Sequence, residues 1–218
     1  MTDVDPENPA GWVTRARGRS LAAAQDRADT QATRLVRTAQ SMLDRSVDVT
    51  VPTLVAKAGM STKTFYRHFA SRDELMLAVL EEEFAAGAQI VARAIEPNVE
   101  PVDRFRAFVR AYFLLPMSYR SVDARRTRIA QTHRLRALYP ERAVEITSGL
   151  HKLLCEIIGE IDGPGHSAEH VDFIARSVLH VLNGLIVDAS LVSATDGDAE
   201  FKQLSESAAA ICERIVNG

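Results

Sequence analysis

The 218-residue sequence has little cysteine and no long hydrophobic run, and each absence excludes a class of protein. Its two cysteines, Cys155 and Cys212, lie far apart and lack the CxxC spacing of zinc or redox centres. We therefore interpret both as reduced core residues, and we expect no metal and no cofactor. No apolar run approaches the roughly 20 residues of a membrane span, and the N-terminus lacks the apolar stretch of a secretory signal. The sequence thus predicts a cytoplasmic protein without a membrane partner.

Strand-like alternation of apolar and polar residues is also missing, and no internal repeat is visible. Apolar residues instead recur at helical spacing, with breaks at Pro97, Pro116, Pro140 and residues 163–165. Besides two short helices within residues 50–69, the pattern predicts helices over Asp29–Arg45, Ser71–Ile95, Val102–Leu115, Ser121–Leu138, Pro140–Glu160, Ala168–Ser193 and Asp198–Val216. The expected fold is therefore all-α, with about nine helices.

Signatures of catalysis are absent with one exception. The sequence has neither a phosphate-binding glycine loop nor a GxSxG motif, but His166–His170 matches the HxxEH pattern of inverted zinc peptidases. The Gly-Pro-Gly break before it puts His166 in or beside a loop, so the two histidines need not share a helical face, and no further ligand motif follows. We predict that the protein is not an enzyme, with a helical metalloenzyme as the remotest alternative.

Charge is unevenly distributed, although the net charge is only −3. Residues 10–76 hold 11 Lys and Arg against 6 Asp and Glu, whereas residues 77–218 hold 15 against 20. A basic head on an acidic body favours a nucleic-acid partner at the head. Before the head, residues 1–28 are expected to form a flexible, partly basic arm. Its Arg15, Arg17 and Arg19 either stay in solvent or reach a DNA minor groove.

The strongest signal is the segment TVPTLVAKAGMSTKTFYRHF, residues 50–69, which predicts two short helices joined by a glycine turn. Thr50 can cap the first helix with its hydroxyl, and Pro52 lies in the first turn, where its missing N–H costs least. Gly59 permits the left-handed backbone that ends this helix, and Ser61 caps the next one. Two helices joined in this way form a helix-turn-helix, which is a DNA-binding motif.

Three parts of this region carry a family resemblance: the AGMS turn at 58–61, the TFYRHF run at 64–69 and the SRDEL helix start at 71–75. With them, the segment from about Thr33 to Leu77 resembles the N-terminal DNA-binding domain of the TetR (tetracycline repressor-like) family of bacterial regulators. The resemblance implies a three-helix DNA-binding domain at residues 29–76. It also implies a helical effector-binding and dimerisation domain at residues 77–218.

If the second short helix enters a major groove, its exposed side chains face base edges and phosphates. Lys63 is the candidate for a base contact, because its ammonium can reach guanine O6 or N7. Phe65 and Phe69 are expected to be core residues that aim the helix. The candidate DNA contacts are Thr50, Thr53, Ser61, Thr62, Lys63, Thr64, Tyr66, Arg67, His68 and Arg72.

No motif marks a ligand site in the body, so its candidates are aromatic, histidine, cysteine and neighbouring apolar side chains. One helical stripe of them either lines a cavity or belongs to the core. The candidate set is Phe84, Phe105, Phe108, Val109, Tyr112, His133, His151, Cys155, Phe173 and His180. Six arginines between residues 120 and 136 either receive an anionic effector, pair with Glu81, Glu82 and Glu83, or face water.

The last two predicted helices carry more apolar surface than one small body hides, and a two-fold dimer would bury it. The resemblance likewise implies a homodimer through these helices, with two heads on a palindromic operator of double-stranded DNA. The preferred interpretation is a repressor that an unknown small-molecule effector releases from its operator. The first alternative is an architectural DNA-binding protein without ligand control, although the large body argues against it.

Overall fold

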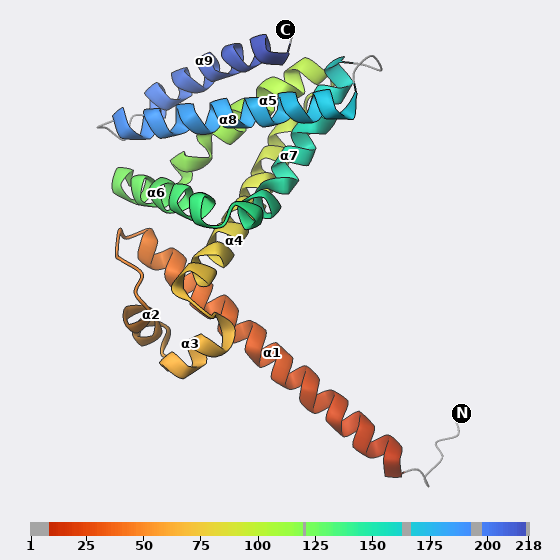
Figure 1. Cartoon of the computed structure of the whole chain (residues 1–218), viewed down its shortest axis with the longest axis vertical. Coiled ribbons are helices and arrows are strands. Elements are labelled where there is room, and N and C mark those ends of the chain that lie inside the picture. Colours follow the sequence, from red (N-terminus) through yellow and green to blue (C-terminus); the bar gives the residue numbers. More distant parts are fainter. Residues whose placement is uncertain (1–8, 120, 163–166, 193–197, 217–218) are drawn as a thin grey trace.

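The computed structural model describes residues 9–119, 121–162, 167–192 and 198–216. Within these residues the chain forms helices with short connections and contains no strand (Figure 1). The helices are α1 (Pro9–Leu43), α2 (Val51–Ala58), α3 (Thr62–His68), α4 (Arg72–Ile95), α5 (Pro101–Leu114), the 3-10 helix η1 (Leu115–Ser118), α6 (Val122–Leu138), α7 (Pro140–Asp162), α8 (Ala168–Val192) and α9 (Asp198–Val216). The predicted all-α fold is confirmed, and α4 to α9 begin and end within two residues of their expected positions.

Helix α1 is longer than predicted, since it begins at Pro9 and not near Asp29. The expected helix start near Asp29 is therefore wrong, and residues 9–28 of the expected arm are helical, while residues 1–8 lie outside the described part of the chain. Proline is tolerated in the first turn of a helix, and the alanines at positions 10, 16 and 22–24 have the highest helix propensity. Figure 1 shows the N-terminal half of α1 extending well past the remainder of the molecule.

The head consists of α1, α2, α3 and the first turns of α4, packed around one hydrophobic core. Leu35, Met42, Leu54, Phe65 and Leu75 are almost completely buried in this core. Burial of each such side chain contributes about 1.5–3 kcal/mol. The two short helices are thereby fixed against α1, with their outer faces left free.

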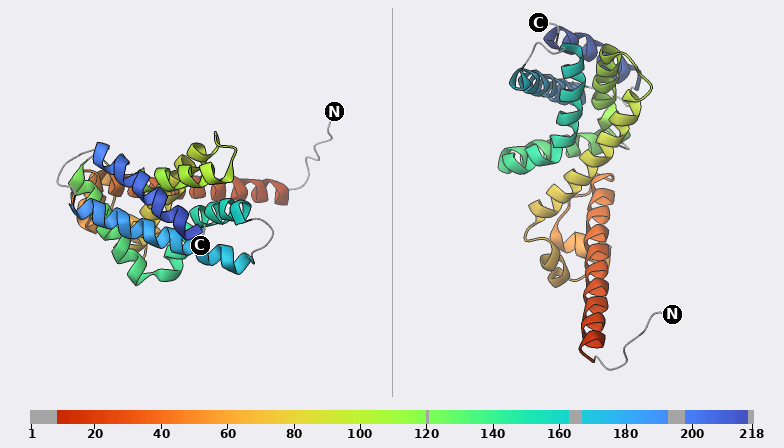
Figure 2. Two further views of the ribbon diagram at one scale, coloured as in Figure 1. Left: turned by 90° about the horizontal axis from the view of Figure 1, so that it is seen from above. Right: turned by 90° about the vertical axis from the view of Figure 1, so that its right-hand side faces the viewer.

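The body consists of α5 to α9 and the second half of α4, around a separate core rich in phenylalanine. Helix α4 belongs to both regions, because Leu75 is buried in the head core and Val91 and Ile95 are buried in the body core. Figure 2 shows α4 running from the head into the body, with α8 and α9 on the outside of the body. Helix α6 lies at the end of the body that faces the head (Figure 1).

Candidate DNA-binding surface and effector cavity

A tight turn at Gly59 joins α2 to α3. Gly59 has left-handed backbone angles (φ 63°, ψ 38°), which L side chains rarely adopt. Its N–H donates to the carbonyl of Ala56 (3.2 Å), and the N–H of Met60 donates to that of Val55 (2.9 Å). These bonds satisfy carbonyls that the end of α2 would otherwise leave free, and so fix the direction in which α3 begins.

Hydroxyl caps begin both helices, as the sequence predicts. Thr50 Oγ1 accepts a hydrogen bond from the N–H of Thr53 at 3.3 Å, and Ser61 Oγ accepts one from the N–H of Thr64 at 3.0 Å. Each cap satisfies one of the N–H groups left unpaired at a helix start. Thr50 and Ser61 therefore have a structural role whether or not they contact DNA.

Helix α3 is anchored on one side and exposed on the other. Phe65 is completely buried, and its ring lies 5.9 Å from that of Phe69, whereas the adjacent Tyr66 is 56% exposed. Among the ten candidate DNA contacts, Thr50, Thr53, Ser61, Thr62, Lys63, Tyr66 and Arg67 are exposed, and Thr64, His68 and Arg72 are partly buried. The outer face of α3 thus presents Lys63 among hydroxyl groups.

Two of the partly buried candidates bind to other parts of the head. His68 Nε2 lies 3.1 Å from Oε1 of Gln31 on α1. The guanidinium of Arg72 donates to the backbone carbonyl of Val49 and lies 3.3 Å from the carboxylate of Asp48. These contacts tie the ends of α3 and α4 to α1 and to the loop before α2, so both side chains help to orient the helix-turn-helix.

Four further cations line an open groove of about 820 Å³ between α1 and α2. They are Arg34, Arg37, Arg45 and Lys57. Arg34 and Arg37 belong to α1, Arg45 lies in the turn after it and Lys57 belongs to α2, so no local motif links the four side chains. Only the excess of basic residues in the head signals their presence.

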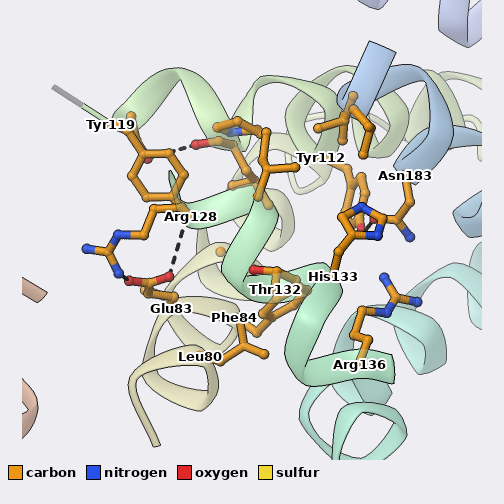
Figure 3. Close-up of a pocket in the computed structure, with 18 of the residues that line it drawn as sticks. Leu80, Glu83, Phe84, Tyr112, Tyr119, Arg128, Thr132, His133, Arg136 and Asn183 are labelled. Atoms are coloured by element: carbon orange, nitrogen blue, oxygen red, sulfur yellow. Dashed lines mark hydrogen bonds and ion pairs between the residues drawn. The ribbon is translucent and has the colours of Figure 1, made fainter. Parts of the chain in front are cut away.

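A cavity of about 220 Å³ lies in the body where α6 meets α4, α5 and α8 (Figure 3). Its lining is Leu80, Glu83, Phe84, Ala86, Gly87, Ile90, Tyr112, Leu115, Pro116, Ser118, Tyr119, Arg128, Ile129, Thr132, His133, Arg136, Asn183, Ile186 and Val187. Phe84, Tyr112 and His133 are the candidate pocket residues that the structure brings together here. Apolar side chains make up much of the wall, with polar groups at its ends.

The other seven candidate pocket residues lie elsewhere: Phe105, Phe108 and Val109 in the body core, Phe173 and His180 on the exposed face of α8, and His151 and Cys155 beside Asp172, where α7 meets α8. Helical spacing identifies an inward-facing stripe but does not distinguish a packed core from a cavity wall. That is why Phe105 and Phe108 matched the pattern although they are fully buried among core residues.

One end of the cavity carries hydrogen-bonding groups that face a common space. Figure 3 shows His133, Asn183 and Arg136 at this end, near Tyr112. The hydroxyl of Tyr112 donates to Oδ1 of Asn183 at 3.0 Å, and burial raises the pKa of Tyr112, so it stays a neutral phenol. Arg136 forms no ion pair with another residue in the described ranges, so its guanidinium can receive an acceptor from a ligand.

At the opposite end, Arg128 connects the cavity to the head. Its side chain is only 5% exposed and pairs with the carboxylates of Glu83 and, at 2.9 Å, Asp44. It also donates to the backbone carbonyl of Gln40 at 3.1 Å, and its guanidinium lies 5.4 Å from the ring centre of Tyr119. Burial lowers the pKa of Arg128, although the hydrogen bond to Asp44 opposes this, and the group remains a cation. Since Asp44 and Gln40 adjoin or belong to α1, the cavity wall is bonded to the head.

A second ion pair joins α6 to the head one and a half turns further along. Arg134 makes two 2.8 Å hydrogen bonds to the carboxylate of Asp73, in the first turn of α4. The hydrogen bond from Arg134 is the main cause that holds the pKa of Asp73 below its usual range. Leu135 is buried in the head core. Helix α6 therefore lines the cavity and is attached to the head.

The arginines between residues 120 and 136 thus have different environments. Arg128 pairs with an acid of α4, as one of the predicted alternatives has it, while Arg136 lines the cavity. Arg126 donates to the backbone carbonyl of Ser190 at 3.1 Å. Arg120 lies outside the described residues. The described arginines of this segment therefore have no common function.

Helices α8 and α9 leave an apolar face uncovered. Phe173 is 66% exposed, Leu204 36% and Ile211 45%. By length and composition α8 could cross a membrane over Ala168–Ser190, but only 22% of its most apolar window is buried. The opposite side of the helix packs in the body core. The exposed side is therefore apolar surface that the described chain does not cover.

The HxxEH segment precedes and begins α8. Ser167 Oγ accepts a hydrogen bond from the N–H of His170 at 3.2 Å, which caps the helix that begins at Ala168. His166 lies outside the described residues. The segment thus has a structural explanation as a helix start.

Residues 35–79 match the model of the family described as bacterial regulatory proteins, tetR family. No curated protein matches the chain. The transcriptional regulator FadR from Bacillus subtilis, solved in complex with stearoyl-CoA, is 12% identical, with a TM-score of 0.63 over 83% of this chain and 96% of that one. A tetR-family regulator from Mesorhizobium loti is 14% identical, with a TM-score of 0.63 over 87% of this chain and 98% of that one. A transcriptional regulator from Rhodococcus sp. Rha1 is 17% identical, with a TM-score of 0.63 over 84% of this chain and 96% of that one. At sequence identities this low, the structural similarity establishes a shared fold alone.

Proposed function

Since its N-terminal domain identifies this chain as a member of the tetR family of bacterial regulatory proteins, we propose that it is a sequence-specific repressor, released from a palindromic operator by a small-molecule effector. The observation that carries the proposal is the position of α6, which lines the cavity and is ion-paired to the head. A DNA-binding protein without ligand control would need neither a cavity nor this connection. The protein acts in the cytoplasm, where its operator is.

Helix α3 is proposed to lie in the major groove with Lys63 at the base edges. Thr62 and Tyr66 are exposed beside it and are suited to phosphates and thymine methyl groups. His68 and Arg72 are proposed to act chiefly by positioning the helix, because their polar atoms already bind within the head. The cations of the α1–α2 groove add attraction for the phosphate backbone that does not depend on sequence.

The effector is proposed to be a small, mostly apolar molecule with one acidic or carbonyl group. Apolar residues such as Phe84 and Ile129 would hold its body, and Arg136, His133 and Asn183 would receive its polar end. The cavity volume of about 220 Å³ is below the roughly 300–1,000 Å³ of pockets for drug-sized ligands. The ligand is therefore expected to be much smaller than the stearoyl-CoA of the Bacillus subtilis regulator.

Release is proposed to proceed through α6. A ligand that occupies the space between α6 and α4 favours a different position of α6, and the ion pairs of Arg128 and Arg134 carry this change to α1 and α4. The exposed apolar face of α8 and α9 is proposed to pair with the same face of a second subunit. In such a dimer the two heads fit half-sites about 34 Å apart only in one arrangement of the bodies.

The proposal is tested by selecting bound duplexes from a random pool and titrating the selected site by fluorescence anisotropy. Lys63→Ala should weaken binding to this site by about 1–3 kcal/mol, while binding to a scrambled duplex changes little. Equal losses on both duplexes would remove Lys63 from the base contacts. Selection of a single half-site would contradict the dimer.

Effector control is tested on the same complex. Small aromatic and aliphatic acids, each with its uncharged amide as a matched control, are screened for a shift in melting temperature and then added to the DNA complex. An acid that binds should lower operator affinity. A ligand that occupies the cavity and leaves operator affinity unchanged would support the architectural alternative.

A further inference from the structure

Three side chains with metal-binding atoms meet where α7 packs against α8, away from the cavity lining. His151 and Cys155 lie one turn apart on α7, and Asp172 lies in the second turn of α8. One ligand atom from each lies within 4.8 Å of the other two. All three residues are partly buried, so the cluster is held by packing and remains open to solvent.

The arrangement is convergent, because the shortest contacts of the thiol and of the carboxylate are to the same imidazole nitrogen. In a Cys-His-Asp relay the thiol and the carboxylate use opposite nitrogens of the imidazole. Here Sγ of Cys155 lies 3.6 Å from Nε2 of His151 and 4.0 Å from its Nδ1, and the nearer nitrogen, Nε2, also lies 3.3 Å from Oδ1 of Asp172. One nitrogen carries at most one proton, so it does not satisfy both neighbours by donation. A cation placed among the three atoms satisfies all of them.

The distances also fit a specific metal geometry. Zinc bonds of about 2.0–2.3 Å at tetrahedral angles place nitrogen and oxygen donors roughly 3.4 Å apart, and nitrogen and sulfur donors roughly 3.6 Å apart. The corresponding distances are 3.3 Å and 3.6 Å. The remaining pair, Sγ and the carboxylate oxygen, lies within 4.8 Å, compared with the roughly 3.6 Å expected around zinc, so metal binding would draw these two atoms together.

In contrast to the expectation of no metal from the sequence, we propose that His151, Cys155 and Asp172 form a zinc site with water in the fourth position. Imidazole, thiolate and carboxylate together are the ligands that zinc takes in proteins, and harder ions such as Mg²⁺ do not select a thiol. The thiol proton passes to solvent as the sulfur–zinc bond forms. Arg176 binds the other carboxylate oxygen of Asp172, which fixes the carboxylate with Oδ1 toward the site.

Zinc at this position joins α7 to α8, next to the exposed Phe173 of the α8–α9 face. Because the folded chain holds the three ligands together and the unfolded chain does not, zinc raises the melting temperature. The site does not depend on the proposed repressor function, since none of its ligands lines the cavity or belongs to the head.

The test uses the full chain, reduced and freed of metal, and adds Zn²⁺ or Co²⁺ alone. We expect one zinc per chain by dialysis and elemental analysis, a higher melting temperature, and a thiolate-to-metal charge-transfer band with Co²⁺. Cys155→Ser should abolish that band, and His151→Asn and Asp172→Asn should each weaken zinc binding by more than the roughly 10–100-fold loss typical of outer-shell changes. Glu169→Gln, an exposed carboxylate one turn before Asp172, is the matched control and should bind as the parent does.

Circular dichroism of each metal-free variant establishes that it is folded before metal is added. Absence of the charge-transfer band in the parent protein would overturn the proposal. So would zinc binding that survives both His151→Asn and Cys155→Ser, because the metal would then lie elsewhere, for example at the histidines that flank the start of α8.

Discussion

The head and the body arrange their functional side chains in different ways. The candidate DNA contacts come from one continuous stretch, Thr50 to Arg72, and seven of the ten are exposed around a small core. The cavity collects its wall from five helices between Leu80 and Val187 and encloses the space among them. A surface formed by adjacent residues keeps its shape as long as the helices that carry it stay folded. A cavity between separate helices changes when any of them moves, which suits it to sense a ligand.

Two helices, α4 and α6, contribute buried side chains to the head and also belong to the body, so they can connect the two regions. Helix α4 contributes to the head core and the body core, and Phe84 packs against both. Helix α6 contributes Leu135 to the head core and five residues to the cavity wall. Helix α7 adds a smaller link, because Ile146 packs against the head core while the rest of its apolar face lies in the body core.

The largest expected effect comes from loss of the anchor of α3. Phe65→Ala removes a completely buried ring from the head core and should destabilise the head by about 3–5 kcal/mol. No side chain of α2 or α3 belongs to the body core, so the body should stay folded. Hydrogen exchange should then accelerate in α2 and α3 while α5 and α9 stay protected.

Phe108→Ala, which removes an equally buried ring from the body core, is the matched control and should reverse the pattern of protection. If Phe65→Ala accelerates exchange uniformly through both regions, the head and the body form one cooperative unit and the comparison fails.

A smaller effect is expected at the buried ion pair. Arg128→Met keeps most of the side-chain volume but leaves the carboxylates of Glu83 and Asp44 without their partner. Removal of one member of a buried pair costs about 3–5 kcal/mol, and the partial exposure of Asp44 favours the lower end. Denaturant unfolding measures the loss. In the DNA assay the variant should bind its operator with reduced or no response to effector.

Adding Glu83→Gln and Asp44→Asn to Arg128→Met removes the unpaired charges and should restore part of the stability, but not the response to effector. Full effector control in the stable triple variant would exclude this pair as the connection.

How much the sequence could reveal also differs between the regions. Caps such as Ser61 and Ser121 and breaks such as Pro140 act locally, so helix positions and the helix-turn-helix were predictable. The start of α1 was not predicted because residues 9–28 carry few large apolar side chains, so an apolar stripe at helical spacing is hard to recognise there, although alanine favours a helix. Only packing can reveal the cavity, because a stripe of phenylalanines looks the same in a core.

The proposed zinc site and the ion pairs of α6 with the head are likewise revealed only by packing. Asp172 lies on a different helix from His151 and Cys155, so ligand spacing along the chain does not reveal the set. In the same way, Arg134 and Asp73 are 61 residues apart, and only the packing of α6 on α4 brings them together.

The smallest expected effect concerns this second link, and it depends on pH. Arg134 holds the pKa of Asp73 below its usual value, so folding stabilises the ionised carboxylate. That stabilisation is complete above the unfolded pKa of about 3.9 and is lost as the pH falls through the lower folded pKa. Asp73→Asn should therefore cost less than about 1 kcal/mol at neutral pH, because Arg134 is 44% exposed and its charge is screened. Urea unfolding of the variant and the parent should give a difference in the free energy of unfolding at pH 7 that narrows as the pH falls below about 4.

Asp48→Asn, whose carboxylate is 78% exposed beside Arg72, is the control and should show little difference at either pH. A deficit in Asp73→Asn that stays constant with pH would mean that packing of the side chain, and not its charge, holds α6 to α4.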